Sequence, residues 1–279
     1  MSTTSATRAT SVRDQRPWLY RSLIVTFARR DIRARFKGTL LGFAWSLALP
    51  LATLAVYSLV FGTIFGQPAP LMGDSGKPGP FPVFLFSGLV VWNMYAVTLS
   101  TAIAGLLGNG PLMKKIFFPP YVPVFGSVVA TFYSSAFEMG LLFAILLALG
   151  NAGPTWIGVL PWFVLFTIFI ASVSVILSVA NVYLRDVNYI VGIVLQLQFY
   201  LTPIIYTLAQ VEDKGGVWLK RIIELQPLGA FVGAFRALVY GLTWGPWEVW
   251  VAMVFWAATA ALVASRFYGR RGLDLSEEL

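Results

Sequence analysis

Residues 111–123, PLMKKIFFPPYVP, carry two adjacent lysines and four prolines between two long apolar stretches. Pro111 suits the first turn of a helix, and the proline pair at 119–120 would end one. The segment therefore predicts a short helix, 112–118, that exposes both lysines. It is too polar to lie in lipid, so it indicates a loop that connects two membrane spans.

The composition around this loop is that of an all-α membrane protein. The chain has 279 residues, of which 58% are hydrophobic and 11% charged, whereas soluble domains carry roughly 25% charged residues. Spans need about 20 apolar residues and are expected to be helical, because lipid offers no partner to unpaired backbone groups. The six predicted spans are 40–65, 81–107, 122–149, 156–184, 187–208 and 247–265.

The basic residues predict the orientation of these spans. If the N-terminus is cytoplasmic, 15 of the 20 lysines and arginines lie on the inner side and five on the outer side. This bias follows the positive-inside rule, so both termini are predicted to be cytoplasmic. The chain then divides into an N-terminal segment, 1–39, a transmembrane domain, 40–265, and a tail, 266–279. The net charge of +8 is thus assigned to topology, not to nucleic-acid binding.

The stretch before the first span, WLYRSLIVTFARRDIRARFK at 18–37, indicates an amphipathic helix. Its apolar side chains gather on one side of the predicted helix, and most of its arginines fall elsewhere. Such a helix is expected to lie on the inner membrane surface. Its basic residues at the predicted interface are Arg29, Arg30, Arg33, Arg35 and Lys37.

The stretch before the last span, residues 218–241, is apolar but interrupted by Pro227, Gly229 and Gly233. It is too broken for a clean span, so it predicts a pair of re-entrant or interfacial helices. Irregular backbone at membrane depth is tolerated only where protein or a cavity covers it.

The residue types exclude several kinds of chemistry. The chain has no cysteine and no histidine, which excludes disulfides, thiol nucleophiles, imidazole catalysis and Cys/His metal sites. It also lacks the G-x-x-x-x-G-K-[ST] phosphate loop, so it cannot cradle ATP in the usual way. No catalytic residue and no metal site is predicted on this chain.

Glu138 is the one carboxylate predicted to lie deep in a span. Such a charge is costly and often marks a pathway or a proton relay. The alternative is a structural carboxylate that pairs with a neighbouring helix or reaches water. Aromatic rings belong by default to interface belts, yet rings inside a bundle offer flat surfaces to sugar rings. The candidate conduit residues are Glu138, Trp45, Trp92 and Tyr206.

Arg185 and Asp186 lie between the fourth and fifth predicted spans, on the predicted inner side. They indicate either a turn that caps two helices through an internal ion pair or a loop that faces a cytoplasmic partner. The lysine loop at 111–123 offers the same choice.

Taken together, six short motifs resemble one known family. In order they are RFKGTLLGFAW (35–45), FLFSGLVVWN (84–93), NGPLMKKIFFP (109–119), NVYLRDV (181–187), LTPIIY (201–206) and QPLGAFVGAFRALVYG (226–241). Phe36, Thr39 and Gln226 replace the usual Tyr, Ser and Asn. The chain resembles the membrane subunits of polysaccharide-exporting ABC transporters, the ABC type 2 permeases that export O-antigen, teichoic acid, cell-wall galactan and related lipid-linked glycans.

The resemblance implies a homodimer that forms a channel in the cytoplasmic membrane of a bacterium, with two separate ATPase subunits docked below. ATP and Mg²⁺ would bind to those partner subunits, and no cofactor is implied for this chain. The implied substrate is a lipid-linked polysaccharide, and nucleic acid is not an implied partner.

The resemblance also assigns roles to particular segments. The loop at 111–119 would be a coupling helix, the N-terminal helix would lie beside the channel entrance, and the broken segment would gate the outer side. The implied ATPase-coupling residues are Leu112, Lys114, Lys115, Phe117, Phe118, Arg185 and Asp186. The implied gate residues are Pro227, Phe231, Phe235 and Arg236.

Three other functions compete with this one. The same architecture serves permeases for drugs or lipids. A secondary carrier or channel would need no ATPase and would couple transport to ions through Glu138. A membrane glycosyltransferase would need a carboxylate cluster, and the predicted spans contain none.

Overall fold

The computed structural model describes residues 20–38, 44–73, 77–116 and 118–271. Within these ranges the regular structure is helical, apart from one isolated bridge between Leu71 and Pro78. The helices are α1 Arg21–Phe36, α2 Trp45–Tyr57, α3 Phe81–Gly108, α4 Gly110–Met113, α5 Tyr121–Ala148, α6 Val159–Tyr183, α7 Val187–Leu201, α8 Leu208–Leu225, α9 Pro227–Val239 and α10 Trp247–Arg271. The π-helix η4, Ser58–Ile64, extends α2, and the 3₁₀-helix η6, Pro154–Gly158, precedes α6.

Five described helical segments are long and apolar enough to cross a membrane, and a bent helix pair raises the number to six. The five segments are Leu47–Ile64, Phe81–Gly108, Tyr121–Ala148, Pro154–Tyr183 and Trp247–Arg270. They match the first four predicted spans and the last one. The prediction of an all-helical, multi-pass membrane protein is confirmed.

The fifth predicted span, 187–208, is wrong in its length. Helix α7 has 15 residues and ends at Leu201, so it is about 22 Å long, less than the roughly 30 Å of a hydrocarbon core. Thr202 is extended, with ψ at 135°. It precedes Pro203, whose ring disfavours helical backbone in the residue before it.

The interrupted segment before the last span forms two helices, α8 and α9, bent by 89° at their junction. Gln226 is extended and Pro227 occupies the first turn of α9, as expected for a residue before proline. Helix α8 begins at Leu208 and is kinked at Gly216, whose backbone is not helical, so its second half begins close to the predicted residue 218. Neither Gly229 nor Gly233 breaks α9. Gly229 is instead a close-approach site, because a Cβ there would collide with the carbonyl of Ile223.

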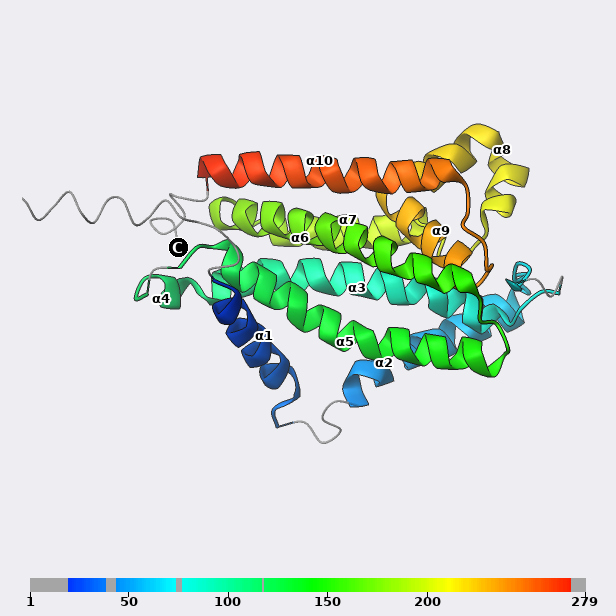
Figure 1. The fold of residues 1–279 in the computed structure, drawn as a ribbon, viewed down its shortest axis with the longest axis horizontal. Coiled ribbons are helices and arrows are strands. Elements are labelled where there is room, and N and C mark those ends of the chain that lie inside the picture. The colour runs from blue at the N-terminus through cyan, green and yellow to red at the C-terminus, as the bar shows by residue number, and fades with distance from the viewer. Residues whose placement is uncertain (1–19, 39–43, 74–76, 117, 272–279) are drawn as a thin grey trace, which may run out of the picture.

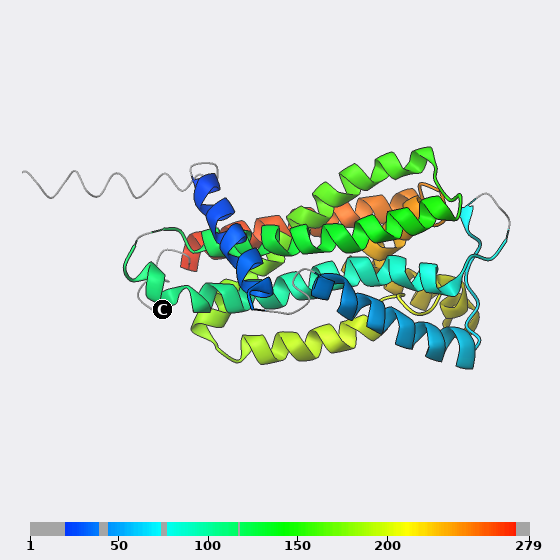
Figure 2. The same ribbon diagram turned by 90° about the horizontal axis from the view of Figure 1, so that it is seen from below.

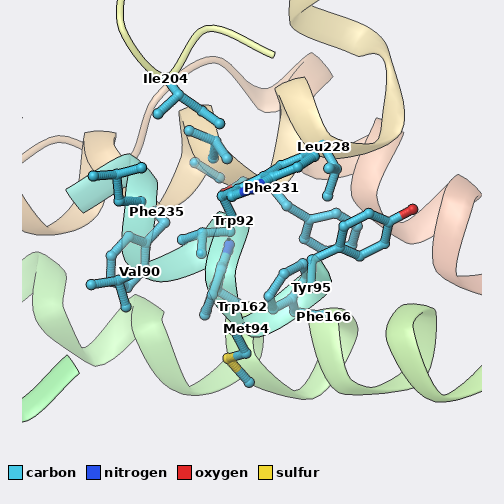
Figure 3. Close-up of a cluster of buried hydrophobic side chains, with 14 of the residues drawn as sticks. Val90, Trp92, Met94, Tyr95, Trp162, Phe166, Ile204, Leu228, Phe231 and Phe235 are labelled. Atoms are coloured by element: carbon cyan, nitrogen blue, oxygen red, sulfur yellow. Dashed lines mark hydrogen bonds between the residues drawn. The ribbon is translucent and has the colours of Figure 1, made fainter. Parts of the chain in front are cut away.

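Helix α3 is the centre of the bundle and packs against α5, α6, α7 and α9. Figure 3 shows the aromatic cluster beside it, in which Trp162 and Phe166 of α6 meet Phe231 and Phe235 of α9. The ring centroids of Trp162 and Phe235 are 4.7 Å apart, and those of Phe166 and Phe231 are 4.9 Å apart. Trp162 Nε1 also donates a 2.9 Å hydrogen bond to the carbonyl of Phe231, so α9 is anchored to α6.

The long helices run side by side, and the connecting segments gather at two opposite ends (Figures 1 and 2). Helix α4, the α6–α7 connection and the C-terminal end of α10 lie at one end, called here the α4 end. Helix α8 lies at the opposite, α8 end. Helix α1 slants across α5 near the α4 end. The cytoplasmic location of the α4 end stays a prediction.

Candidate functional site

A polar cleft lies between α1, α2, α3 and α5 and has a volume of about 320 Å³. It is named here the polar cleft, and the residues that define it are Arg35, Trp45, Asn93, Thr131, Ser135 and Glu138. On α5 the polar positions 131, 134, 135 and 138 recur every three or four residues, so they share one helix face. This cleft brings together Glu138 and Trp45, two of the four predicted conduit residues.

Each charged group of the polar cleft is held by a hydrogen bond. Asn93 Nδ2 donates to Glu138 Oε2 at 3.1 Å, and Arg35 donates from a guanidinium nitrogen to Thr131 Oγ1 at 2.9 Å. Thr101 Oγ1 lies 3.2 Å from Thr131 Oγ1. Burial lowers the pKa of the Arg35 guanidinium below its ordinary value, and the carboxylate of Asp31 acts in the opposite direction. Arginine nevertheless stays charged.

An aromatic groove of about 450 Å³ adjoins the polar cleft and shares Thr53 and Asn93 with it. The rings that define this aromatic groove are Tyr57, Trp92, Phe199 and Tyr200. The centroids of Trp92 and Phe199 are 5.2 Å apart. Trp92, the third predicted conduit residue, lies here. Tyr206, the fourth, is not part of either hollow; its hydroxyl donates to the carbonyls of Tyr200 and Leu201 at 3.1 Å.

The predicted coupling helix, 112–118, is shorter than expected. Helix α4 spans only Gly110–Met113, and the backbone continues through a turn to Ile116. Phe118 is buried among core side chains. Leu112 is half-buried, whereas Lys114 and Lys115 are exposed as predicted. Phe117 lies outside the described residues.

Helix α1 is bonded to the start of α4 and to α5. Arg30 Nη1 donates to Asn109 Oδ1 at 2.6 Å, and Asn109 lies immediately before α4. Asp31 accepts from Arg30 at 2.8 Å and from Ser127 Oγ at 3.1 Å. Sequence reasoning missed Asn109 and Asp31, because nothing local to either residue shows that α1 crosses this turn.

A separate open groove of about 980 Å³ is lined by three arginines of α1 and the lysine after it, Arg29, Arg30, Arg33 and Lys37. Arg35 differs from these four cations, because it reaches into the polar cleft. The five predicted interface residues therefore occupy two different surroundings.

Arg185 and Asp186 are exposed in the α6–α7 connection. In the part of the chain that the structure describes, no ion pair joins their side chains, contrary to the first of the two predicted alternatives. The start of α7 is held instead by Asn181, whose Oδ1 accepts a 3.0 Å hydrogen bond from the backbone N–H of Asn188.

The four predicted gate residues lie in or next to the core. Phe231, Phe235 and Arg236 are buried, and Pro227 starts α9 at the break. Arg236 donates to Phe84 O at 2.9 Å, to Ser87 Oγ at 3.2 Å and to the carbonyls of Pro203 and Ile204. Its guanidinium carbon lies 3.8 Å from the centroid of the Phe84 ring. These contacts make Arg236 a clamp between α3, α9 and the α7–α8 connection.

Comparison with known proteins places the chain in a family. A family model described as ABC-2 type transporter matches residues 22–240. The chain belongs to the ABC-2 type transporter family. The match on this ABC-2 chain runs from α1 through α9, so it includes the polar cleft, the aromatic groove and the α4 turn.

Individual relatives of the ABC-2 chain are named as permeases. It is 27% identical over 262 residues to the O-antigen export system permease protein RfbA of Myxococcus xanthus, covering 93% of this chain and 96% of the relative. It is also 27% identical over 218 residues to the protein of the same name from Klebsiella pneumoniae, covering 77% of this chain and 79% of the relative.

Proposed function

We propose that this chain is the transmembrane subunit of an ATP-driven exporter that moves a lipid-linked polysaccharide across the cytoplasmic membrane of a bacterium. The observation that carries the proposal is its similarity over 93% of its length to an O-antigen export permease, together with its ABC-2 family membership. In this proposal two copies of the chain form the channel and two separate ATPase subunits bind ATP and Mg²⁺. The chain itself performs no catalysis.

The α4 end is the proposed docking surface for the ATPase subunits. Lys114 and Lys115 are exposed there, and the α6–α7 connection with Arg185 and Asp186 lies at the same end (Figure 1). The hydrogen bond from Arg30 to Asn109 supports a route by which a displacement of the α4 turn reaches α1. Helix α1 in turn contributes Arg35 to the polar cleft.

The proposed channel lies between two copies of the chain along α2 and α7. Helix α7 buries only Val191 and Leu195, and large apolar side chains cover its other faces. Exposed side chains of α7 include Tyr189, Ile190, Ile193, Val194, Leu197 and Tyr200. The aromatic groove opens between α2, α3 and α7, and its rings offer flat surfaces on which sugar rings can slide.

The proposed outer gate is the α8–α9 pair, in which α9 serves as the fixed part. Helix α9 is held by Trp162, Arg236 and Thr155, the last of which donates to the carbonyl of Leu238 at 2.8 Å. Helix α8 contains a non-helical glycine, Gly216, with φ at 78°. Motion of α8 about its junction with α9 would open and close the outer side.

Purification of the tagged chain from its native membrane tests the proposal. We expect an ATP-binding subunit in equal amount and vanadate-sensitive ATP hydrolysis in the eluate, together with loss of surface polysaccharide when the chain is deleted. A chain that purifies without a nucleotide-binding subunit, under conditions that preserve other complexes, would favour an ATP-independent carrier. An ATPase partner combined with unchanged surface polysaccharide would favour export of a drug or a lipid.

A further inference from the structure

The position of the polar cleft in the bundle shows what kind of group can reach it. Helix α5 has 28 residues and is therefore about 42 Å long. Thr131 lies about 15 Å and Glu138 about 25 Å along it from Tyr121. The polar side chains of α5 that line the cleft, called here the polar wall, thus lie in the middle of a candidate span. Lipid headgroups lie outside the hydrocarbon core, which is about 30 Å thick.

The polar wall is incompletely paired. Glu138 is 7% exposed and uses one carboxylate oxygen for Asn93; within the described ranges the other oxygen has no hydrogen-bond partner. The hydroxyl of Ser135, a residue 4% exposed, likewise has none there. Unpaired polar groups at membrane depth are costly, and those that persist often face a ligand or a water-filled cavity.

The opposite wall of the cleft, on α2, is apolar apart from Thr53. Helix α2 supplies Trp45, Leu49 and Pro50, and Trp45 is half exposed. A ligand that suits both walls needs several hydroxyls on its edge and an apolar C–H face for the indole ring. The single arginine and single glutamate of the cleft offer no excess of either charge. The volume of about 320 Å³ falls at the lower end of the range for small-molecule sites.

We propose that the polar cleft binds one sugar unit of the transported glycan, at a site beside the channel and separate from the aromatic groove. Asn93, Ser135 and Glu138 would bond the sugar hydroxyls, and Trp45 would cover its C–H face. Thr53 and Asn93, which line both hollows, connect this sugar site to the groove. The inference rests on the proposed function, because it takes the transported substrate to be a glycan.

The absence of cysteine makes the cleft directly testable. Ser135→Cys would place one thiol in the polar cleft, and Thr53→Cys would place one at its border with the aromatic groove. Ser172→Cys is the matched control, because Ser172 lines a different groove, between α5, α6 and α10. Each variant is assembled with its ATPase partner in nanodiscs and labelled with N-ethylmaleimide. The probes are octyl glucoside and octylphosphocholine, below their micelle concentrations, which share a tail and differ in headgroup.

We expect octyl glucoside, and not octylphosphocholine, to slow labelling of S135C. The expected slowing is about tenfold at ten times the half-protecting concentration, with S172C unaffected. Adding Glu138→Gln to S135C keeps the shape of the side chain but weakens its hydrogen-bond acceptor. It should therefore raise the half-protecting concentration of octyl glucoside about tenfold.

Three outcomes would overturn the sugar site. Equal protection by octylphosphocholine would assign the cleft to lipid headgroups, and protection of S172C as well would show a general detergent effect. If N-ethylmaleimide labels neither S135C nor T53C, the cleft is closed to solutes. All three leave the proposed exporter standing, because its ATPase partner and its export of polysaccharide are measured on the unmodified chain.

Discussion

Asn93 Nδ2 donates a 3.1 Å hydrogen bond to Glu138 Oε2, which joins α3 to α5 near the middle of the bundle. The pair explains how a carboxylate is tolerated at this depth, since a buried polar group without a partner costs about 1–3 kcal/mol. The predicted alternatives for Glu138, a conduit residue or a structural carboxylate, are therefore not exclusive, because one oxygen bonds α3 and the residue also lines the polar cleft.

Replacement of Glu138 should show how much its hydrogen bond to Asn93 contributes to stability. Glu138→Gln keeps an acceptor for Asn93, so the midpoint of thermal unfolding in detergent should change little. Glu138→Leu leaves Asn93 unpaired and should destabilise by about 1–3 kcal/mol. Adding Asn93→Leu to Glu138→Leu should recover part of the loss, as a double-mutant cycle would show. Additive effects of the two leucine substitutions would contradict a direct bond.

Arg236→Ala should be among the most destabilising single changes in the chain. It would leave the carbonyls of Pro203 and Ile204 without the donor that Arg236 supplies, at a cost of about 1–3 kcal/mol for each buried unpaired group. The control is Arg221→Ala on α8, where the guanidinium is exposed and lies 3.9 Å from Glu224, a contact worth at most about 1 kcal/mol. Thermal unfolding followed by tryptophan fluorescence measures both. Equal midpoints for the two variants would show that the clamp does not hold α9.

Gly126→Ala should loosen helix α1 from α5. A Cβ at Gly126 would lie 2.6 Å from Cβ of Phe27, so α1 must shift, at a cost of about 1–3 kcal/mol. We expect trypsin to cut the arginines of α1 about tenfold faster in this variant. Gly140→Ala on the same helix meets nothing within 4 Å and should leave the cleavage rate unchanged. The same rate in both variants would rule out this packing contact.

Charge reversal at the α4 turn tests the proposed docking surface. K114E/K115E should lower the yield of ATPase subunit that co-purifies with the chain, because both lysines are exposed at the α4 end. K214E/R221E makes the same change of charge on exposed residues of α8, at the opposite end, and should leave the yield unchanged. A wild-type yield with K114E/K115E would assign docking to other residues.

The bond between Arg30 and Asn109 predicts a coupling defect without a docking defect. Asn109→Ala removes the acceptor for Arg30 Nη1 while leaving both lysines of the turn in place. We expect the ATPase subunit to co-purify normally, but export per ATP hydrolysed to fall. Arg30→Ala should produce the same defect, and the double variant should be no worse than either single one. Additive defects would show that the two residues act separately.

Much of the fold follows from local sequence. Five of the six predicted spans match helical segments. Their apolar runs are long, and in lipid the backbone N–H and C=O groups of such a run must bond to one another, which a helix allows. The break before Pro227 was predicted for a similar reason, since proline acts on its immediate neighbours. By the same rule, Pro203 marks the end of α7 at Leu201. The prediction from hydropathy, a span over 187–208, missed this helix end, because the apolar run continues past the proline.

The site itself depends on tertiary structure. Sequence order separates Asn93 from Glu138 and Arg30 from Asn109, and only the packing of α3 and α1 against neighbouring helices brings each pair into hydrogen-bond distance. The same packing buries Phe118, and it places Phe231, Phe235 and Arg236 in the core. Hydropathy and proline act over a few residues and determined the number and kind of helices. Contacts between helices distant in sequence decided which polar groups meet, because they depend on how whole helix faces pack.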